Sequence, residues 1–250
     1  MDSGEVTIGA FAVICGGAAL GFLVRRFLRE HHLEPRTQDA VKVATGVVAS
    51  MTALVLGLLV ASAKGGFDTH AAEARTFVIN VTLLDRSMRL YEPPLTDERK
   101  ELAKFAADIR DKLWNPQSTL GTNQILHELD HIRNRFRNLD PQTLQNKSLK
   151  GRYMSLSDTV VLAANELLLQ EPVSVPIQLI VIVDIWLAIT FFAFALFAPF
   201  NLVSAASLAV GAAAVALALF MIVEMNAPFQ GFIIVPPTTM DGAISEITGS

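Results

Sequence analysis

Two histidines and a glutamate have the spacing of a catalytic zinc site. His127, Glu128 and His131 fit the pattern H-E-x-x-H, in which two histidines one helical turn apart bind zinc and the glutamate acts as a general base. Both histidines fall opposite the apolar stripe of the predicted helix, so we expect them to face solvent. No obvious third ligand follows in the sequence. A solvated charged helix face is the favoured interpretation, and we predict no catalytic residue, no metal site and no cofactor.

Asp184 is the one charged residue in an apolar block formed by residues 177–198. A carboxylate at the centre of a membrane span costs roughly 2.5–3.5 kcal/mol, and such a group is expected to face other helices, water or a partner. Two interpretations stay open. Asp184 is either a carboxylate of an ion path or the acceptor of a structural hydrogen bond from a neighbouring helix.

Hydroxyl side chains accompany branched aliphatic residues in a second apolar block, residues 43–63. They include Thr45, Ser50 and Thr52. A narrow, mostly apolar channel lining has this composition, and so has a helix packed between neighbours. Together with Asp184, these residues form the candidate ion path or intramembrane polar site.

Four apolar blocks must position these side chains. Of the 250 residues, 52% are hydrophobic and only 18% are charged. The apolar excess is concentrated in residues 6–24, 43–63, 177–198 and 202–223. Each block is long enough for a helix that crosses a bilayer, which takes about 20 residues. The sequence therefore predicts an all-α integral membrane protein with four transmembrane helices in two pairs, 1–63 and 177–223. The first span has no distinguishing residues, and the small residues of the fourth are typical of a packing helix.

The polar insert, residues 64–176, carries apolar residues at every third or fourth position, which predicts an extramembrane domain made of helices. The stripes comprise Phe67, Ala71, Ala74, Val78, Val81, Leu84, Met88 and Tyr91, then Leu102, Phe105, Ile109 and Leu113, then Ile125, Leu129, Ile132, Phe136 and Leu139. The pair Gly65-Gly66, with Asp68 as an N-cap, predicts a hinge where the second span leaves the membrane. Residues 224–250 are predicted to be a polar C-terminal tail.

The basic residues between the first two spans predict an orientation. Arg25, Arg26, Arg29, Arg36 and Lys42 lie in this short loop. The positive-inside rule places the loop, residues 25–42, in the cytoplasm and the helical insert on the non-cytoplasmic side. The net charge of −4 argues against a nucleic-acid partner.

Short motifs near the spans carry a family resemblance. They comprise Glu73 after span two, Trp186, Pro199 and Asn201 in and after span three, and Glu224, Pro228, Phe229 and Gly231 after span four. Over about residues 40–240, their order and spacing resemble the bestrophin-like domain family of bacterial membrane proteins. Membership of this family defines an architecture better than an activity.

The resemblance implies a function through the bestrophins, which are pentameric anion channels whose second span lines the pore. It implies a multi-pass protein of the bacterial inner membrane, a homo-oligomer (a pentamer by analogy), with the lipid bilayer and inorganic ions as partners. Bestrophins hold their large domain in the cytoplasm, whereas the charge rule favours the opposite side. The leading hypothesis is an ion channel, not an enzyme, with span two along the path. The alternatives are a non-conducting scaffold or sensor whose helical domain binds a partner protein, and a membrane zinc hydrolase using His127, Glu128 and His131.

Overall fold

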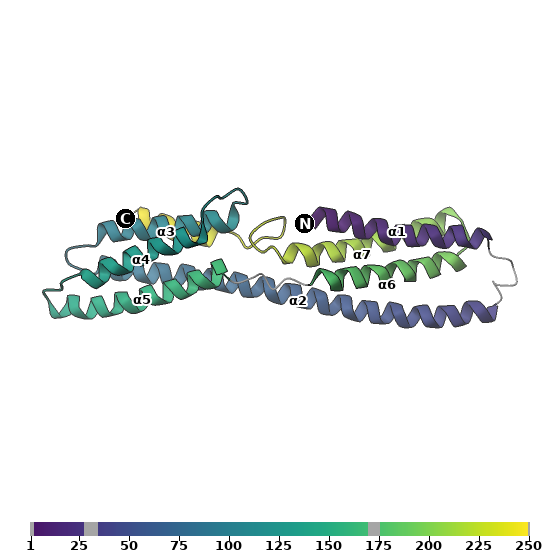
Figure 1. The fold of residues 1–250 in the computed structure, drawn as a ribbon, viewed down its shortest axis with the longest axis horizontal. Helices are drawn as coiled ribbons and strands as arrows, with labels where there is room; N and C mark the ends of the chain where they lie inside the picture. Colours follow the sequence, from purple (N-terminus) through teal and green to yellow (C-terminus); the bar gives the residue numbers. More distant parts are fainter. Residues whose placement is uncertain (1–2, 28–34, 170–175, 250) are drawn as a thin grey trace. The chain divides into compact units, whose positions relative to one another are not determined.

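The regular elements of the chain are all α-helices in the part that the structure describes. A computed structural model describes residues 3–27, 35–169 and 176–249, and no strand occurs in these ranges. The helices are α1 (Ser3–Phe27), α2 (Pro35–Arg89), α3 (Thr96–Trp114), α4 (Thr122–Asn138), α5 (Leu144–Leu169), α6 (Ile177–Phe197), α7 (Leu202–Met225) and α8 (Thr238–Thr248) (Figure 1). The predicted all-α class is confirmed.

Four helices are long and apolar enough to cross a membrane. The candidate spans are Gly4–Phe27 in α1, Thr37–Arg89 in α2, Gln178–Phe197 in α6 and Leu202–Met225 in α7. The mean hydropathy of their most apolar windows lies between 2.1 and 2.6. Each span coincides with or contains one of the four predicted apolar blocks to within one residue at each end, so the four candidate spans are confirmed.

The chain divides into two compact units. The first, here called the span unit, comprises Met1–Gly66 and Val173–Asn226. The second, here called the helical unit, comprises Phe67–Pro172 and Ala227–Ser250. Helix α2 contributes residues to both units, because it runs without a break from Pro35 to Arg89.

The hinge predicted at Gly65-Gly66 is wrong. Both residues lie inside α2, and Asp68 therefore does not cap a new helix. A glycine inside a helix costs only about 1 kcal/mol relative to alanine. Buried residues of α2 continue on both sides of the glycine pair, with Ala63 in the core of the span unit and Ala74 in the core of the helical unit.

Helix α1 is the element against which α6 and α7 pack in the span unit (Figure 1). Its buried residues Ala10, Ile14 and Ala18 recur one turn apart. Beside them, a Cβ atom placed on Gly17 would lie 2.5 Å from the carbonyl oxygen of Ala188, and one placed on Gly21 would meet the carbonyl oxygen of Phe192. These glycines form a G-x-x-x-G motif, which lets helix backbones approach closely in lipid. The description of the first span as lacking distinguishing residues is therefore wrong.

The helical unit has one core, to which α2, α3, α4, α5 and α8 all contribute. Its largest fully buried side chains include Phe77, Phe105, Phe136 and Tyr153. The predicted stripes are buried from Ala74 to Tyr91, from Leu102 to Ile109 and from Ile125 to Phe136, which confirms the periodicity there. Their end residues Phe67, Ala71, Leu113 and Leu139 are only half-buried. The core is built by amphipathic helices that bury one face each.

The predicted polar tail contains an additional helix. Within residues 224–250, α8 buries Met240, Ala243 and Ile247 and packs against α3. These three residues are spaced by three and four positions, so one face of α8 is apolar. The apolar spacing of α8 is present in the sequence, but we did not predict the helix because it is short and follows two prolines.

Candidate functional site

The three hydroxyl residues predicted on span two do not share one face of α2. Thr45 and Thr52 are buried, whereas Ser50 is exposed. Each residue advances an α-helix by about 100°, so Thr52 lies almost above Thr45, while Ser50 lies about 140° away. The hydroxyl of Thr52 donates to the carbonyl oxygen of Val48 at 2.8 Å, within its own helix. The structure does not bring the three hydroxyls together.

The exposed face of α2 is a long apolar stripe that includes Ser50. Its large side chains are Val43, Val47, Met51, Leu54 and Leu58, all more than half exposed. The opposite face carries Leu59 and Ala63, which belong to the core of the span unit. Helix α2 therefore buries one face within the chain and leaves the other free for contact with lipid, water or a second copy.

Asp184 lies on α6 beside the buried stripe of that helix. Its Oδ1 atom is buried and has no hydrogen-bond partner among the described residues. Its neighbours Ile180, Val183 and Leu187 are buried core residues of the span unit. The structure shows no donor for Oδ1 of the kind expected from a structural hydrogen bond. Burial of this carboxyl oxygen costs free energy, because its lost hydration is not replaced by a hydrogen bond.

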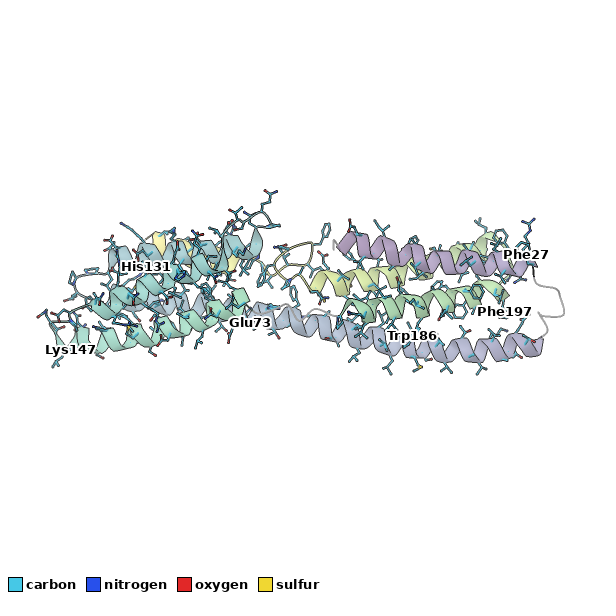
Figure 2. All side chains as sticks on the ribbon, in the orientation of Figure 1. Phe27, Glu73, His131, Lys147, Trp186 and Phe197 are labelled. Atoms are coloured by element: carbon cyan, nitrogen blue, oxygen red, sulfur yellow. The ribbon has the colours of Figure 1, made fainter. Side chains whose placement is uncertain are left out.

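In the described part of the chain, no third ligand side chain joins the H-E-x-x-H pattern. His127 and His131 are exposed on α4, in agreement with the predicted solvent-facing position. Figure 2 labels His131 on this helix. The carboxylate of Glu128 forms an ion pair with Lys104 of α3. Among the described residues, no group of three His, Cys, Asp or Glu side chains could hold a metal ion. The glutamate that would act as the base is thus paired with a lysine.

Glu128 also changes the ionisation of a second carboxyl group. Burial, followed by the hydrogen bond and the negative charge of Glu128, raises the pKa of Asp108, and the nearby Lys104 opposes this shift. Contact with Glu128 raises the pKa of Lys104. The three groups form a small charged cluster between α3 and α4.

Two of the family-like residues meet through His70 in the helical unit. The Nδ1 atom of His70 lies 3.0 Å from Oε2 of Glu73, one turn further along α2, and only 10% and 13% of these side chains are exposed. The ring of Phe229 packs edge-on against His70, with centroids 6.2 Å apart, and against Trp114, with centroids 4.8 Å apart. Residues from α2, α3 and the segment after α7 therefore share one cluster. His70 and Trp114 were not predicted from the sequence.

The segment around Phe229 is a closed loop. The backbone N–H of Val235 donates to the carbonyl oxygen of Pro228 at 2.7 Å, and the indole of Trp114 donates to the carbonyl oxygen of Val235 at 2.7 Å. Gly231 has a φ of 103°, a conformation that side-chain-bearing residues rarely adopt. The Pro-Phe-x-Gly motif therefore has a structural explanation, since each of its three defining residues shapes this loop.

The remaining family-like residues lie on α6 and α7 of the span unit or in the turn between them. Pro199 follows the end of α6, and the side chain of Asn201 caps α7 by accepting from the backbone N–H of Ser204 at 2.8 Å. Trp186 is half-buried on α6, and its carbonyl oxygen accepts from the hydroxyl of Thr190. Glu224 is buried in the last turn of α7. These residues define the two-span hairpin.

A buried carboxylate that the sequence did not reveal joins three helices. Asp85 of α2 is 1% exposed and accepts from Arg89 at 2.8 Å and from Arg99 of α3 at 2.6 Å. Both arginines also donate to backbone carbonyls in the last turn of α8, at Glu246 and Ile247. Arg89 lies one turn from Asp85 on α2, but no local pattern signals the contacts to Arg99 and to α8, because these partners lie on other helices.

The profile of the Bestrophin-like domain matches residues 11–240. The chain belongs to the bestrophin-like family. The sequence resemblance is confirmed, and the match extends it from span two back into α1. No curated protein matches this bestrophin-like chain.

Solved structures support the same assignment at the level of the fold. The chain resembles a crystal structure of a bacterial bestrophin homolog from Klebsiella pneumoniae determined by zinc phasing, with a TM-score of 0.65 and 15% identity over 97% of this chain and 98% of that one. A single-substitution variant of that homolog matches with a TM-score of 0.67 and 15% identity over 100% and 99%. Another variant gives 0.65 and 16% over 97% and 99%. The protein is thus a bestrophin-like membrane protein with the fold of a bacterial bestrophin homolog.

Proposed function

We propose that this bestrophin-like protein forms an oligomeric ion-conducting pore in the bacterial inner membrane, with the exposed face of α2 along the ion path. The observation that carries the proposal is the one-sided burial of α2, whose apolar stripe from Val43 to Leu58 has no partner within the described chain. In bestrophins, the second span lines the pore. Five copies arranged about an axis, by analogy, would give this stripe a common inner surface.

Within this proposal the predicted polar residues have different roles. Ser50 lies on the path itself, because it shares the exposed face with Met51 and Leu54. Thr45 and Thr52 support α2 from the buried face. Asp184 organises the span unit behind the path. An apolar stripe of this kind suits a narrow constriction that gates by excluding water.

We further propose that the four candidate spans cross the bilayer as two pairs, with the 25–42 loop in the cytoplasm. Arg25 and Arg26 lie in the last turn of α1, and the charge rule favours the cytoplasmic side for such residues. Arg29 lies outside the described residues. Reporter fusions after Ser3 and after residue 140 test the orientation, and a cytoplasmic signal after residue 140 would contradict it.

The decisive experiment combines ion flux with cysteine labelling. The sequence contains one cysteine, Cys15, so a Cys15→Ser background allows single cysteines to be placed at will. In liposomes, we expect ion flux from the purified oligomer. A charged thiol reagent should reduce that flux in the Ser50→Cys and Leu54→Cys variants.

Leu217→Cys is the matched control, because Leu217 is 61% exposed on α7, away from the proposed path. Its labelling should leave flux unchanged. Absence of flux from an intact oligomer contradicts conduction and favours the scaffold or sensor. Flux that is insensitive to labelling on α2 contradicts the assigned path but not conduction.

A further inference from the structure

A cavity at one end of the span unit combines an apolar wall with two arginines. It has a volume of about 460 Å³ and is lined by Ala19, Phe22, Leu23, Arg25, Arg26 and Phe200. The first five residues belong to the end of α1, and Phe200 lies in the turn between α6 and α7. The labelled residues Phe27 and Phe197 mark this end of the unit (Figure 2).

The walls of this cavity are held in place. The rings of Phe22 and Phe200 pack edge to face, with centroids 5.2 Å apart and planes at 82°. The guanidinium of Arg25 donates to the carbonyl oxygen of Ala198, which follows the last residue of α6. Because an arginine has five N–H donors, this one contact leaves further donors of Arg25 for a ligand.

The charge and the location of the cavity select its occupant. None of the six described lining residues is acidic, and two of them are arginines, so this described lining carries positive charge. Arg25 and Arg26 lie in the last turn of a candidate membrane span, at the depth where arginines reach the interface. Leu20 and Leu23 are more than half exposed on the preceding turns. An occupant therefore needs an anionic head and an apolar chain that continues along α1.

We infer that this cavity is a binding site for an anionic phospholipid, whose phosphate is held by Arg25 and Arg26 and whose acyl chain lies along Ala19, Leu23 and Phe200. Basic pockets between spans at the membrane surface bind such headgroups, since the arginine fork matches phosphate oxygens. The site is independent of ion conduction. Free inorganic phosphate shares the head chemistry but would leave the apolar wall unfilled.

Titration of the full-length protein in detergent tests this site. The probes are dioctanoyl phosphatidylglycerol, dioctanoyl phosphatidylcholine and inorganic phosphate. We expect saturable binding of the first at concentrations where the other two do not bind. Each arginine near a membrane surface contributes a factor of about five to binding of anionic lipid, so Arg26→Gln should weaken the phosphatidylglycerol complex about fivefold.

Two further variants separate binding from folding. Arg26→Lys keeps the charge and should retain most of the affinity. Arg137→Gln removes an exposed arginine of α4 in the helical unit and should leave affinity unchanged. Equal affinity for phosphatidylcholine, equal binding of inorganic phosphate, or wild-type affinity in a monodisperse Arg26→Gln protein would each overturn the assignment.

Discussion

The carboxylate of Asp85 lies 2.6 Å from the guanidinium of Arg99, and the two residues belong to consecutive helices separated by a turn. Asp85 is 1% exposed and Arg99 12% exposed. The pair also holds the C-terminal helix, because Arg99 donates to the carbonyl oxygen of Ile247 at 3.1 Å. One buried acid thus connects α2, α3 and α8.

Removal of this acid should strongly destabilise the helical unit. Asp85→Ala removes the buried carboxylate that accepts from Arg89 and Arg99, and breaking a buried pair in this way costs about 3–5 kcal/mol. The measurement is the free energy of unfolding from chemical denaturation in detergent. Asp97→Ala is the control, since Asp97 is 80% exposed and lies 3.9 Å from an exposed Lys100. A similar effect of both substitutions would contradict the assigned importance of the buried pair.

The close packing of α1 on α6 predicts a difference between neighbouring glycines. In Gly17→Ala and Gly21→Ala, the new methyl groups meet backbone oxygens of Ala188 and Phe192, so the helices must separate. We expect a loss of about 1–3 kcal/mol for each, as for other overpacked sites. Gly16→Ala is the control, because a Cβ atom there meets nothing within 4 Å. Thermal unfolding in detergent should rank Gly16→Ala as the most stable of the three variants.

Helix positions and buried stripes could be predicted because they depend on local periodicity. The stripe ending in Tyr91 and the stripe containing Phe105 are buried as expected, since a 3.6-residue repeat fixes which side chains share a face. The same geometry places Ser50 on a different face of α2 from Thr45 and Thr52, and this separation could have been predicted from the sequence alone. The G-x-x-x-G motif at Gly17 and Gly21 is also a local pattern, and the close packing of α1 could have been predicted from it.

Contacts between distant segments could not be predicted in this way. Asp85 and Arg99 are both unremarkable charges in the sequence, and only the packing of α2, α3 and α8 brings them together. The same holds for His70 and Phe229, which lie far apart in the chain. The local patterns identify the faces of helices, whereas the partner of each face depends on the tertiary fold.

Two glycines of the C-terminal segment should respond in opposite directions to alanine. Gly231 has a φ of 103°, and a side chain there costs at least about 1 kcal/mol. Gly242 lies inside α8, and a Cβ atom there meets nothing within 4 Å, so alanine should stabilise the helix by up to about 1 kcal/mol. Thermal unfolding of the two variants measures the difference. Stabilisation by Gly231→Ala would contradict the described loop.

Two aspartates one turn apart on α3 predict opposite dependences of stability on pH. The pKa of Asp108 is raised, chiefly by burial and then by Glu128, whereas a hydrogen bond from Asn115 lowers the pKa of Asp111. A raised carboxyl pKa favours the protonated folded state, so its contribution is present below about pH 3.9 and is lost as the pH rises through the folded value. A lowered pKa contributes above about pH 3.9 and is lost as the pH falls.

Substitution by asparagine at either position removes the ionisable group, so the change in stability shows whether the charged carboxylate stabilises or destabilises the fold. At neutral pH, Asp108→Asn should be more stable than the wild type and Asp111→Asn less stable, because only the second substitution removes a favourable charge. The Asp108→Asn difference should shrink as the pH is lowered from about 7 toward about 4, whereas the Asp111→Asn difference should persist to about pH 4 and shrink only as the pH falls further. Unfolding temperatures across this range provide the measurement. The same sign for both variants at neutral pH would show that Glu128 and Asn115 do not control these carboxyl groups as described.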